Sequence, residues 1–144
     1  KNTHSIFSFS DQDEIGTAVA EVEVHGETFT LYNVHPDGSD TAMLIFAETL
    51  LKDINNKEKV VALGDYNLHK DEIPYQRIDA ELLNAWSSVY PSGSSETGSA
   101  ISENDWIDHI FLSPDLQARD PVYLLAPESH TDHPAHWALV YWEK

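Results

Sequence analysis

Alternating apolar and polar residues predict a β-hairpin near the start of the chain. Residues 19–24 (VAEVEV) and 29–34 (FTLYNV) alternate with the period of two that half-buried strands show. The four residues between these runs include Gly26, and glycine adopts the positive φ that tight turns need. We therefore expect an antiparallel hairpin here, and the pattern of residues 6–9 indicates a further strand before it.

A different spacing predicts a helix after the hairpin. Over residues 41–55, apolar side chains recur every three or four positions: Met43, Phe46, Ala47, Leu50, Leu51 and Ile54. This spacing places them along one face of an amphipathic helix, with Ser39 or Asp40 as its N-terminal cap. The apolar run 60–63 (VVAL) that follows is typical of a central strand covered on both faces.

Weaker patterns occupy the second half of the chain. We expect a short helix over residues 79–86, a loop over 87–104, strands over 106–112, 122–125 and 137–142, a connection over 114–121 and a polar loop over 128–134. Helices and strands are thus mixed along 144 residues that show no internal repeat and no dividing linker. These features favour one α/β domain over residues 1–144, built as a layered sandwich.

The net charge and composition of the chain exclude several classes of function. Eight lysines and arginines stand against 25 aspartates and glutamates, which gives a formal charge of −17. This balance argues against a protein that binds by neutralising many phosphates with cationic side chains. The absence of cysteine excludes disulfides, thiolate metal sites and cysteine nucleophiles. Because the sequence has no membrane-spanning apolar run and its first ten residues do not resemble a signal peptide, we expect a soluble domain, in a compartment that the sequence leaves open.

Four polar clusters lie where predicted strands meet loops, which is where α/β proteins bind ligands. Asn33 and His35 are two positions apart in a strand, so both side chains point to the same face. Asp65 and Asn67 follow the buried VVAL run with the same spacing. Each pair also has a structural explanation, either an exposed strand end or a hydrogen-bonded turn after glycine.

The other two clusters combine aspartate with histidine. Asp108 interrupts the apolar strand over 106–112, and a carboxylate there is costly unless a cation, a histidine or a metal ion pairs with it. Asp132 and His133 are adjacent and precede the last strand. They offer an anionic metal ligand and a titratable base at neighbouring positions, although a polar turn before Pro134 also explains them.

Four motifs, N-V-H, V-V-A-L-G-D-Y-N, W-I-D-H-I-F-L-S and T-D-H-P in this order, resemble the signature blocks of the endonuclease/exonuclease/phosphatase superfamily. The resemblance extends from about Gly16 to the end of the chain. It implies the deoxyribonuclease-I-like fold, a four-layer α/β sandwich of two mixed β-sheets with outer helices. It also implies that a phosphodiesterase, phosphatase or nuclease hydrolyses phosphate esters here with the help of a divalent metal.

Matched residue by residue, the resemblance gives the aspartate–histidine clusters catalytic roles. His133 corresponds to the general base or to the group that binds the scissile phosphate, and Asp108 to the carboxylate that orients its imidazole. Asp132 corresponds to a metal ligand or a group that positions water. These roles agree with elementary chemistry, because an oriented histidine accepts a proton near neutral pH and contributes roughly 10²–10⁴-fold to a rate.

The resemblance also gives roles to the first two clusters. Asp65 and Asn67 correspond to the pair that contacts the attacking water, the metal or the phosphate. His35 corresponds to the histidine near the leaving group, with Asn33 as a neighbouring amide that binds phosphate or supports the site. Oxygen ligands of this kind suit Mg²⁺, with Mn²⁺ or Ca²⁺ as alternatives. Since the chain has few cationic side chains, the metal rather than arginine would offset most of the phosphate charge.

The sequence departs from the family in three respects. His109 stands where many relatives have tyrosine, and Pro134 follows the Asp-His pair one position earlier than in many of them. An N-terminal half of the family fold supplies an asparagine and the glutamate that is the principal metal ligand, and no residue before Asn33 matches either. We therefore expect the C-terminal half of the fold, whose parent chain supplies the N-terminal half. These residues alone are expected to bind Mg²⁺ weakly and to turn over little substrate.

The substrate class is set mainly by charge. A small phosphoester or a phospholipid headgroup is favoured over nucleic acid, because a surface of −17 repels duplex DNA. Two other classes of protein stay open. The first is a non-catalytic module that keeps the fold and binds a ligand or partner. The second is an acidic globular protein without a site, in which His35, Asp108 and His133 would titrate independently and Mg²⁺ would not change the melting temperature.

Overall fold

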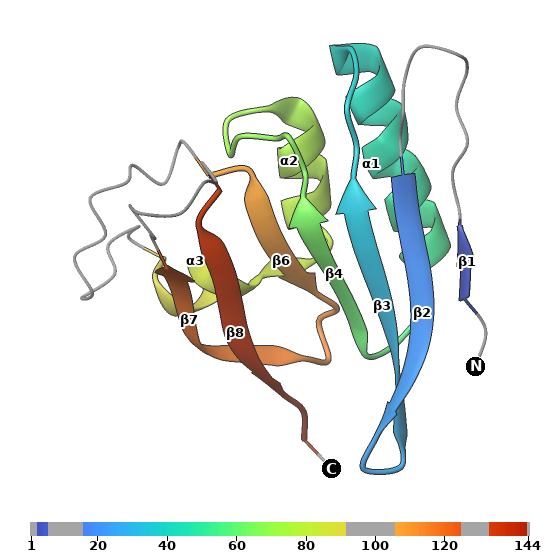
Figure 1. Cartoon of the computed structure of the whole chain (residues 1–144), viewed down its shortest axis with the longest axis vertical. Coiled ribbons are helices and arrows are strands. Elements are labelled where there is room, and N and C mark those ends of the chain that lie inside the picture. Colours follow the sequence, from blue (N-terminus) through green and yellow to red (C-terminus); the bar gives the residue numbers. More distant parts are fainter. Residues whose placement is uncertain (1–2, 6–15, 92–105, 125–132, 144) are drawn as a thin grey trace.

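The computed structural model describes residues 3–5, 16–91, 106–124 and 133–143. Its strands are β1 (Thr3–Ser5), β2 (Gly16–Val24), β3 (Glu27–His35), β4 (Val60–Asp65), β5 (Leu83–Asn84), β6 (Asp108–Leu112), β7 (Gln117–Leu124) and β8 (Ala135–Tyr141). Its helices are α1 (Asp40–Ile54), α2 (Ile73–Asp79) and α3 (Ala85–Val89). The large sheet has the strand order β1-β2-β3-β4-β6-β5, and the small sheet consists of β7 and β8 (Figure 1).

The predicted hairpin is confirmed. β2 and β3 pair in antiparallel register from Gly16 opposite His35 to Val24 opposite Glu27. His25 and Gly26 in the turn both have positive φ, 53° and 85°, as expected for a two-residue turn between twisted strands. The alternating pattern therefore sets both the pairing and the face of the sheet that is buried.

The predicted helix is confirmed as α1, and it connects two parallel strands. The hydroxyl of Ser39 accepts a hydrogen bond from the backbone nitrogen of Ala42 at 3.4 Å and so caps the first turn. β3 and β4 lie side by side in parallel, with α1 as the crossover between them. Because parallel neighbours end at the same edge of a sheet, the ends of β3 and β4 lie together.

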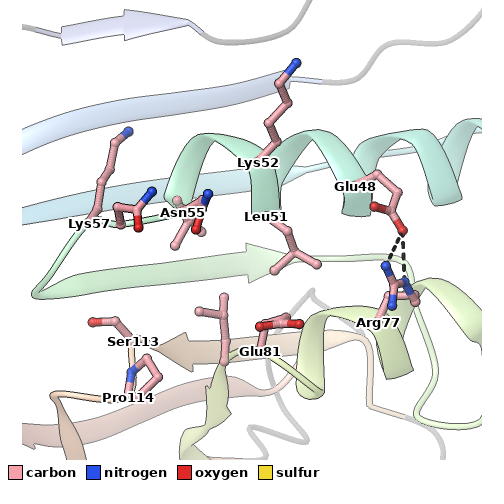
Figure 2. A pocket seen from close by; sticks show the side chains of 12 residues that line it. Glu48, Leu51, Lys52, Asn55, Lys57, Arg77, Glu81, Ser113 and Pro114 are labelled. Carbon is pink, nitrogen blue, oxygen red and sulfur yellow. Dashed lines mark hydrogen bonds and ion pairs between the residues drawn. The ribbon is translucent and has the colours of Figure 1, made fainter.

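Local ion pairs surround a cavity of about 440 Å³ beside the C-terminal half of α1, called here the α1 cavity (Figure 2). Lys57 Nζ lies 2.7 Å from Asp53 Oδ2 and also 2.7 Å from the hydroxyl oxygen of Tyr32. Arg77 of α2 lies 2.9 Å from Glu48 of α1 and links the two helices. These cations are therefore neutralised by carboxylates close to them.

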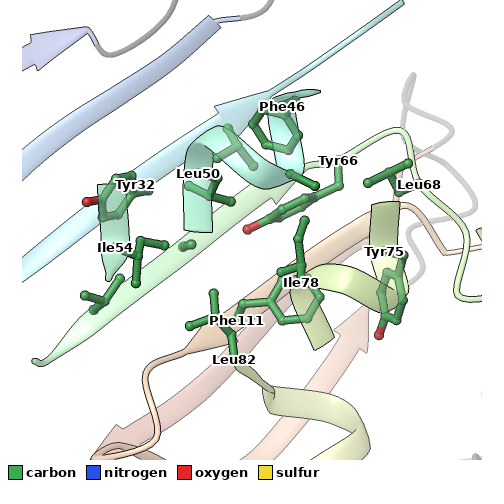
Figure 3. Packing of buried hydrophobic residues seen from close by; sticks show 14 of the residues in the cluster. Tyr32, Phe46, Leu50, Ile54, Tyr66, Leu68, Tyr75, Ile78, Leu82 and Phe111 are labelled. Carbon is green, nitrogen blue, oxygen red and sulfur yellow. The ribbon is translucent and has the colours of Figure 1, made fainter. Parts of the chain in front are cut away.

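The main core lies between the two helices and the large sheet (Figure 3). The apolar face of α1 is buried there, with Phe46 and Leu50 completely covered. Tyr66 is at the centre, with its ring centroid 6.1 Å from that of Phe46 and 5.3 Å from that of Phe111. Ile78 of α2 closes this core from the other side. Burial of these side chains holds the helices on the sheet and fixes the loop that follows β4.

The helix predicted over residues 79–86 is wrong. The chain instead forms α2 before this segment, the short strand β5 within it and α3 at its end. Pro74 occupies the first turn of α2, where a backbone N–H has no partner within the helix and its absence in proline costs nothing. This helix therefore starts earlier than expected. The side chain of Asn84 accepts hydrogen bonds from the backbone nitrogens of Trp86 and Ser87 and starts a new helix. Pro74 in the first turn of α2 and the cap at Asn84 thus mark two helix starts where the pattern predicted one helix.

The connection predicted over residues 114–121 is also wrong in part, because β7 already begins at Gln117. The pairing of β7 with β8 shifts between Arg119 and Val122, and Asp120 has a φ of 51°. This irregularity accommodates Pro121 inside a strand, which regular pairing would not. The loop predicted over 87–104 is wrong at its start, because residues 87–89 belong to α3, which Asn84 caps. The strand predicted over 6–9, most of that loop and most of the loop predicted over 128–134 lie outside the described residues.

The layers expected of the family fold are present in part. Helices α1 and α2 lie on one face of the large sheet and the small sheet lies on the other (Figure 1). Phe29 and Trp142 pack edge to face between the sheets, with ring centroids 4.9 Å apart. The second sheet is an antiparallel pair rather than a mixed sheet, and Trp137, Leu139 and Tyr141 are exposed on β8. Within the described residues, none of the helices has the length and apolar composition needed to cross a membrane.

Candidate functional site

Three strands bring polar residues to one edge of the large sheet. β3 and β4 end at His35 and Asp65, and antiparallel β6 begins at Asp108 opposite Asp65. Side chains alternate along strands, so these three residues share the face that the small sheet covers in part. Gly64 has a φ of 140°, and a Cβ there would lie 2.1 Å from the carbonyl oxygen of Val34. Glycine therefore permits β3 and β4 to approach closely beside the site.

His133 reaches the same edge from the small sheet, two residues before β8. Its Nδ1 lies 2.8 Å from Asp108 Oδ2, and its Nε2 lies 3.9 Å from Asp65 Oδ2. His35 Nε2 lies 3.7 Å from the same oxygen of Asp65. The side chains of Asp65 and Asp108 are 20% and 22% exposed, whereas that of His35 is 71% exposed. Two half-buried carboxylates thus contact two more exposed imidazoles, and these four residues are called here the strand-end site.

Asn67 supports the strand-end site from the loop after β4. Its backbone nitrogen donates to Asp65 Oδ1 at 2.8 Å, which closes a turn around the carboxylate. Its own φ is 48°, a conformation that asparagine tolerates better than most residues. The side-chain nitrogen of Asn67 donates to the carbonyl oxygen of Pro36 at 2.9 Å. Asn67 therefore ties the loop after β4 to the loop after β3 and fixes one oxygen of Asp65.

The electrostatics of the strand-end site favour a cation. Burial is the main cause that raises the pKa of Asp108 above its ordinary value, and the nearby charge of Asp65 raises this pKa further. The hydrogen bond with His133 acts in the opposite direction. Two carboxylates directly opposite each other on neighbouring strands repel, so a positive charge between them would be stabilising.

A stack of aromatic rings lies beside Asp108, and two of its members, Tyr123 and His136, are outside the four polar clusters of the sequence. Tyr123 of β7 stacks on Trp106 at 3.9 Å and on His136 of β8 at 3.9 Å, measured between ring centroids. The hydroxyl of Tyr123 donates to the backbone oxygen of Asp108 at 2.6 Å. The stack thereby fixes the start of β6 relative to β8, and His133 lies two residues before β8. The alternation of residues 137–142, extended by one position, would have placed His136 on the inner face.

Burial keeps two further histidines neutral. It lowers the pKa of His136 to about 3 and that of His109 to about 4. His109 alternates with Asp108 and therefore faces the main core, where its Nε2 lies 2.9 Å from the backbone oxygen of Leu68. Its ring contacts Tyr75 edge to face with centroids 4.9 Å apart. The histidine that replaces the family tyrosine is thus part of the core rather than of the strand-end site.

The structure brings some of the candidate residues together and not others. His35, Asp65, Asp108 and His133 meet, with Asn67 in contact with Asp65. Asn33 is exposed on the same face of β3 as His35, one pair further from the edge. Asp132 lies outside the described residues.

Asp65, Asp108 and His133 have the composition of a metal site. Each offers one ligand atom, and these atoms lie within 4.8 Å of one another. Two carboxylates and an imidazole suit Mg²⁺ or Mn²⁺. Among the described residues, the ion pairs of both carboxylates are with histidine and none is with lysine or arginine. The donor set therefore fits a divalent cation.

The sequence pattern of the Endonuclease/Exonuclease/phosphatase family matches residues 4–133. The chain belongs to this family. The search of curated proteins finds no match. Solved structures agree on the fold. D. rerio TDP2 complexed with a single strand DNA product is 16% identical, with a TM-score of 0.74. The human Nocturnin catalytic domain with bound sulfate is 17% identical, with a TM-score of 0.72, and an endonuclease/exonuclease/phosphatase from Bacteroides vulgatus is 17% identical, with a TM-score of 0.68.

Membership confirms the resemblance carried by the four motifs, and it makes this chain a member of a family of phosphoesterases that typically use a divalent metal. The three structures differ from the chain in length. They match 98%, 99% and 99% of this chain, but the chain spans only 67%, 59% and 64% of theirs. At this level of identity the likeness concerns the fold.

Proposed function

We propose that the domain containing this chain is a divalent-metal-dependent hydrolase of phosphate esters. The observation that carries the proposal is the convergence of Asp65, Asp108 and His133, from three separate strand ends, to within 4.8 Å. Membership in the family supports it. Acidic clusters at protein surfaces are common, but this one includes a histidine held by a carboxylate, which suits proton transfer.

In this proposal His133 is the general base. Asp108 engages Nδ1 at 2.8 Å, so Nε2 is the nitrogen left to accept a proton from the attacking water. Nε2 faces Asp65, whose carboxylate helps to position that water. His35, the most exposed group of the strand-end site, contacts the leaving group.

A divalent cation would be held by Asp65, Asn67 and Asp132. Of the three residues whose ligand atoms lie within 4.8 Å of one another, Asp65 would be the metal ligand, while Asp108 and His133 would serve beside it as the orienting carboxylate and the base. Mg²⁺ is the first choice, with Mn²⁺ or Ca²⁺ as alternatives, and it would offset the charge of the phosphoryl oxygens. Because the side-chain nitrogen of Asn67 donates to Pro36, its carbonyl oxygen is the atom available to a metal or to water. Asn33 is proposed as a second amide that contacts phosphate.

We infer that full activity needs the N-terminal half of the domain from the parent chain. The outer face of the small sheet supports this inference, because Trp137, Leu139, Tyr141 and Leu124 are all exposed there. Exposed apolar patches of this kind mark surfaces that contact another polypeptide, a ligand or a membrane, and a further segment of the same domain is one such contact. The greater length of the matched structures agrees with such a segment.

For the substrate we propose a small phosphoester or a phospholipid headgroup rather than duplex DNA. The formal charge of −17 repels a polyanion, whereas one phosphate is compensated by one bound cation. A non-catalytic binding module that keeps the fold is the second candidate.

The test is hydrolysis of bis(4-nitrophenyl) phosphate by residues 1–144 and by the same residues joined to the N-terminal half from the parent chain. We expect Mg²⁺-dependent hydrolysis by the longer protein, abolished by a chelator, and little by residues 1–144. Strong hydrolysis by residues 1–144 would overturn the need for the N-terminal half. Binding of phosphate esters by the longer protein without hydrolysis would favour the binding module.

A further inference from the structure

A second cavity of about 420 Å³ lies between the first turn of α1 and the loop from β4 to α2. Met43 and Leu68 are buried beneath it, and Leu44 and Ile73 form its apolar walls. The side chains of Ile73 and Leu44 are 66% and 38% exposed. Apolar side chains at this exposure gain stability from a ligand that covers them. This cavity is called here the α1–α2 pocket.

The α1–α2 pocket lies at the same edge of the large sheet as the strand-end site. Both segments that line it begin where β3 and β4 end, at His35 and Asp65. Leu68 is three residues after Asp65, so their Cα atoms are at most about 11 Å apart even along a fully extended chain. The bond from Asn67 to Pro36 holds the two loops together between pocket and site. The two lie on opposite faces of the large sheet, because the strand-end residues face the small sheet and the pocket lies on the side of α1 and α2.

The charge of the α1–α2 pocket selects among ligands. Three carboxylates and no lysine or arginine are among its lining residues. Asp40 and Glu72 lie at the N-terminal ends of α1 and α2, where the helix dipole offsets part of their charge. Glu72 also accepts a hydrogen bond from the backbone nitrogen of His69. Asp71 is exposed and lies outside both helices, so it is the carboxylate best placed to pair with a ligand.

We propose that the α1–α2 pocket binds a ligand whose apolar part carries a positive charge. Ile73 and Leu44 contact the apolar part, and Asp71 pairs with the cation. The proposal is independent of the proposed function, because the pocket binds such a ligand with or without hydrolysis at the strand-end site. An anionic ligand is excluded by the three carboxylates.

The test compares three probes of equal length, n-hexylammonium, 1-hexanol and hexanoate, in titrations of residues 1–144 followed by NMR. Methyl signals of Ile73 and Leu44 report on the pocket. We expect hexylammonium to shift these signals at the lowest concentration, 1-hexanol at a higher one and hexanoate not at all. Equal binding of hexylammonium and hexanol would show an apolar pocket without charge selection, and it would overturn the proposal. Tighter binding of hexanoate, or no shift with any probe, would overturn it as well.

Two variants assign the binding to the residues named. Asp71→Asn should weaken the binding of hexylammonium roughly two- to fivefold, as expected for an exposed ion pair, and leave that of hexanol unchanged. Ile73→Ser should weaken the binding of both hexylammonium and hexanol. Because the side chain of Ile73 is exposed, the variant should keep the fold, and an unfolding curve checks this. Asp120→Asn, which removes an exposed carboxylate on β7, is the matched control and should leave both affinities as they are.

His133→Ala separates this inference from the proposed function. It removes the proposed base but lies outside the α1–α2 pocket, so probe binding should not change. Loss of hydrolysis with unchanged probe binding would leave both proposals standing. Failure of probe binding in a protein that hydrolyses phosphoesters would reject the pocket alone. Probe binding by the longer protein that contains the N-terminal half, without hydrolysis by that same protein, would reject the proposed function alone.

Discussion

Carboxylates have different ion-pair partners around the α1 cavity and in the strand-end site. Beside α1, Lys57 pairs with Asp53 and Arg77 with Glu48, each at less than 3 Å. At the strand ends, the ion pairs of Asp65 and Asp108 are only with histidines among the described residues. The chain has 25 acidic and 8 basic residues, so it cannot neutralise every carboxylate internally. This difference supports the proposal that a cation binds in the second region.

The ion pairs around the α1 cavity and the proposed functional site therefore have different locations in this molecule. Around the α1 cavity, the ion pair of Arg77 with Glu48 joins α2 to α1, and the hydrogen bond from Tyr32 to Asp53 joins the sheet to α1. The strand-end site instead places two like charges opposite each other on neighbouring strands, an arrangement that destabilises a sheet by itself. Sites of this kind are retained in folded proteins when a ligand or a reaction requires them.

The largest effect is expected from the proposed base. His133→Ala in the longer protein should lower turnover by roughly 10²–10⁴-fold, because general base catalysis contributes about that factor. Its melting temperature should change little, since the side chain is exposed to solvent. Hydrolysis rates and thermal unfolding measure the two effects.

His25→Asn is the matched control for this variant. His25 is an exposed histidine in the β2–β3 turn, and asparagine suits its positive φ. It should keep full activity. If both variants kept full activity, His133 would have no part in the mechanism.

A smaller effect concerns acid stability. The pKa of His109 is about 4 in the folded protein and 6.5 ordinarily, so between these values the unfolded chain binds a proton that the folded chain does not. Stability should thus fall as pH decreases from about 6.5 to about 4, by on the order of 3 kcal/mol, and should not fall further from this group below pH 4.

His109→Gln tests this expectation, since glutamine can still donate to Leu68 but does not titrate in this range. Urea unfolding at a series of pH values should give a shallower loss of stability for the variant. His136 changes stability in the same direction and remains in both proteins. Parallel curves for the two proteins would show that His109 is not held neutral by burial.

The aromatic stack predicts an effect of about 1 kcal/mol. Tyr123→Phe keeps the rings stacked on Trp106 and His136 but removes the hydrogen bond to the backbone oxygen of Asp108. One such bond contributes about 1 kcal/mol to the free energy of unfolding. Tyr141→Phe, which removes an exposed hydroxyl on β8, serves as the control and should cost less. Equal losses for the two variants would contradict a specific role for the bond to Asp108.

The smallest predicted effect contrasts the two regions directly. Without metal at pH 8, Asp65→Asn should leave stability unchanged or raise it by up to about 1 kcal/mol, because it removes repulsion with Asp108. Asp53→Asn should lower stability by less than about 1 kcal/mol, because it removes the charge that pairs with Lys57. Urea unfolding in the presence of a chelator measures both. A loss of stability from Asp65→Asn as large as that from Asp53→Asn would remove the contrast.

Short-range patterns explain why part of the fold was predictable. The hairpin and α1 follow from alternation and from the three- and four-residue spacing within each segment. The division of residues 79–86 depends on the side chain of Asn84, which binds two backbone nitrogens, and a pattern of apolar residues does not reveal this. The early start of β7 depends on β8, a strand distant in the sequence, and on an irregularity that accommodates Pro121.

The same distinction applies to the site. Polar residues at strand ends identified His35, Asp65, Asp108 and His133 as candidates, because strand geometry gathers such residues at one edge. The stacking of Tyr123 between Trp106 and His136 joins three separate segments, and local alternation indicates only that His136 faces inward, not which rings it contacts. The roles in catalysis proposed for the strand-end residues are tested by the variants described above.

The most direct test of the strand-end site is a titration of residues 1–144 with Mn²⁺, observed as paramagnetic broadening of NMR signals. We predict that signals of His133, His35 and Asp65 broaden first, while those of Lys57, Asp53 and Arg77 around the α1 cavity remain sharp at the same concentration. The double variant Asp65→Asn, Asp108→Asn should lose this selectivity. Simultaneous broadening across the acidic surface, without preference for the strand ends, would contradict the account.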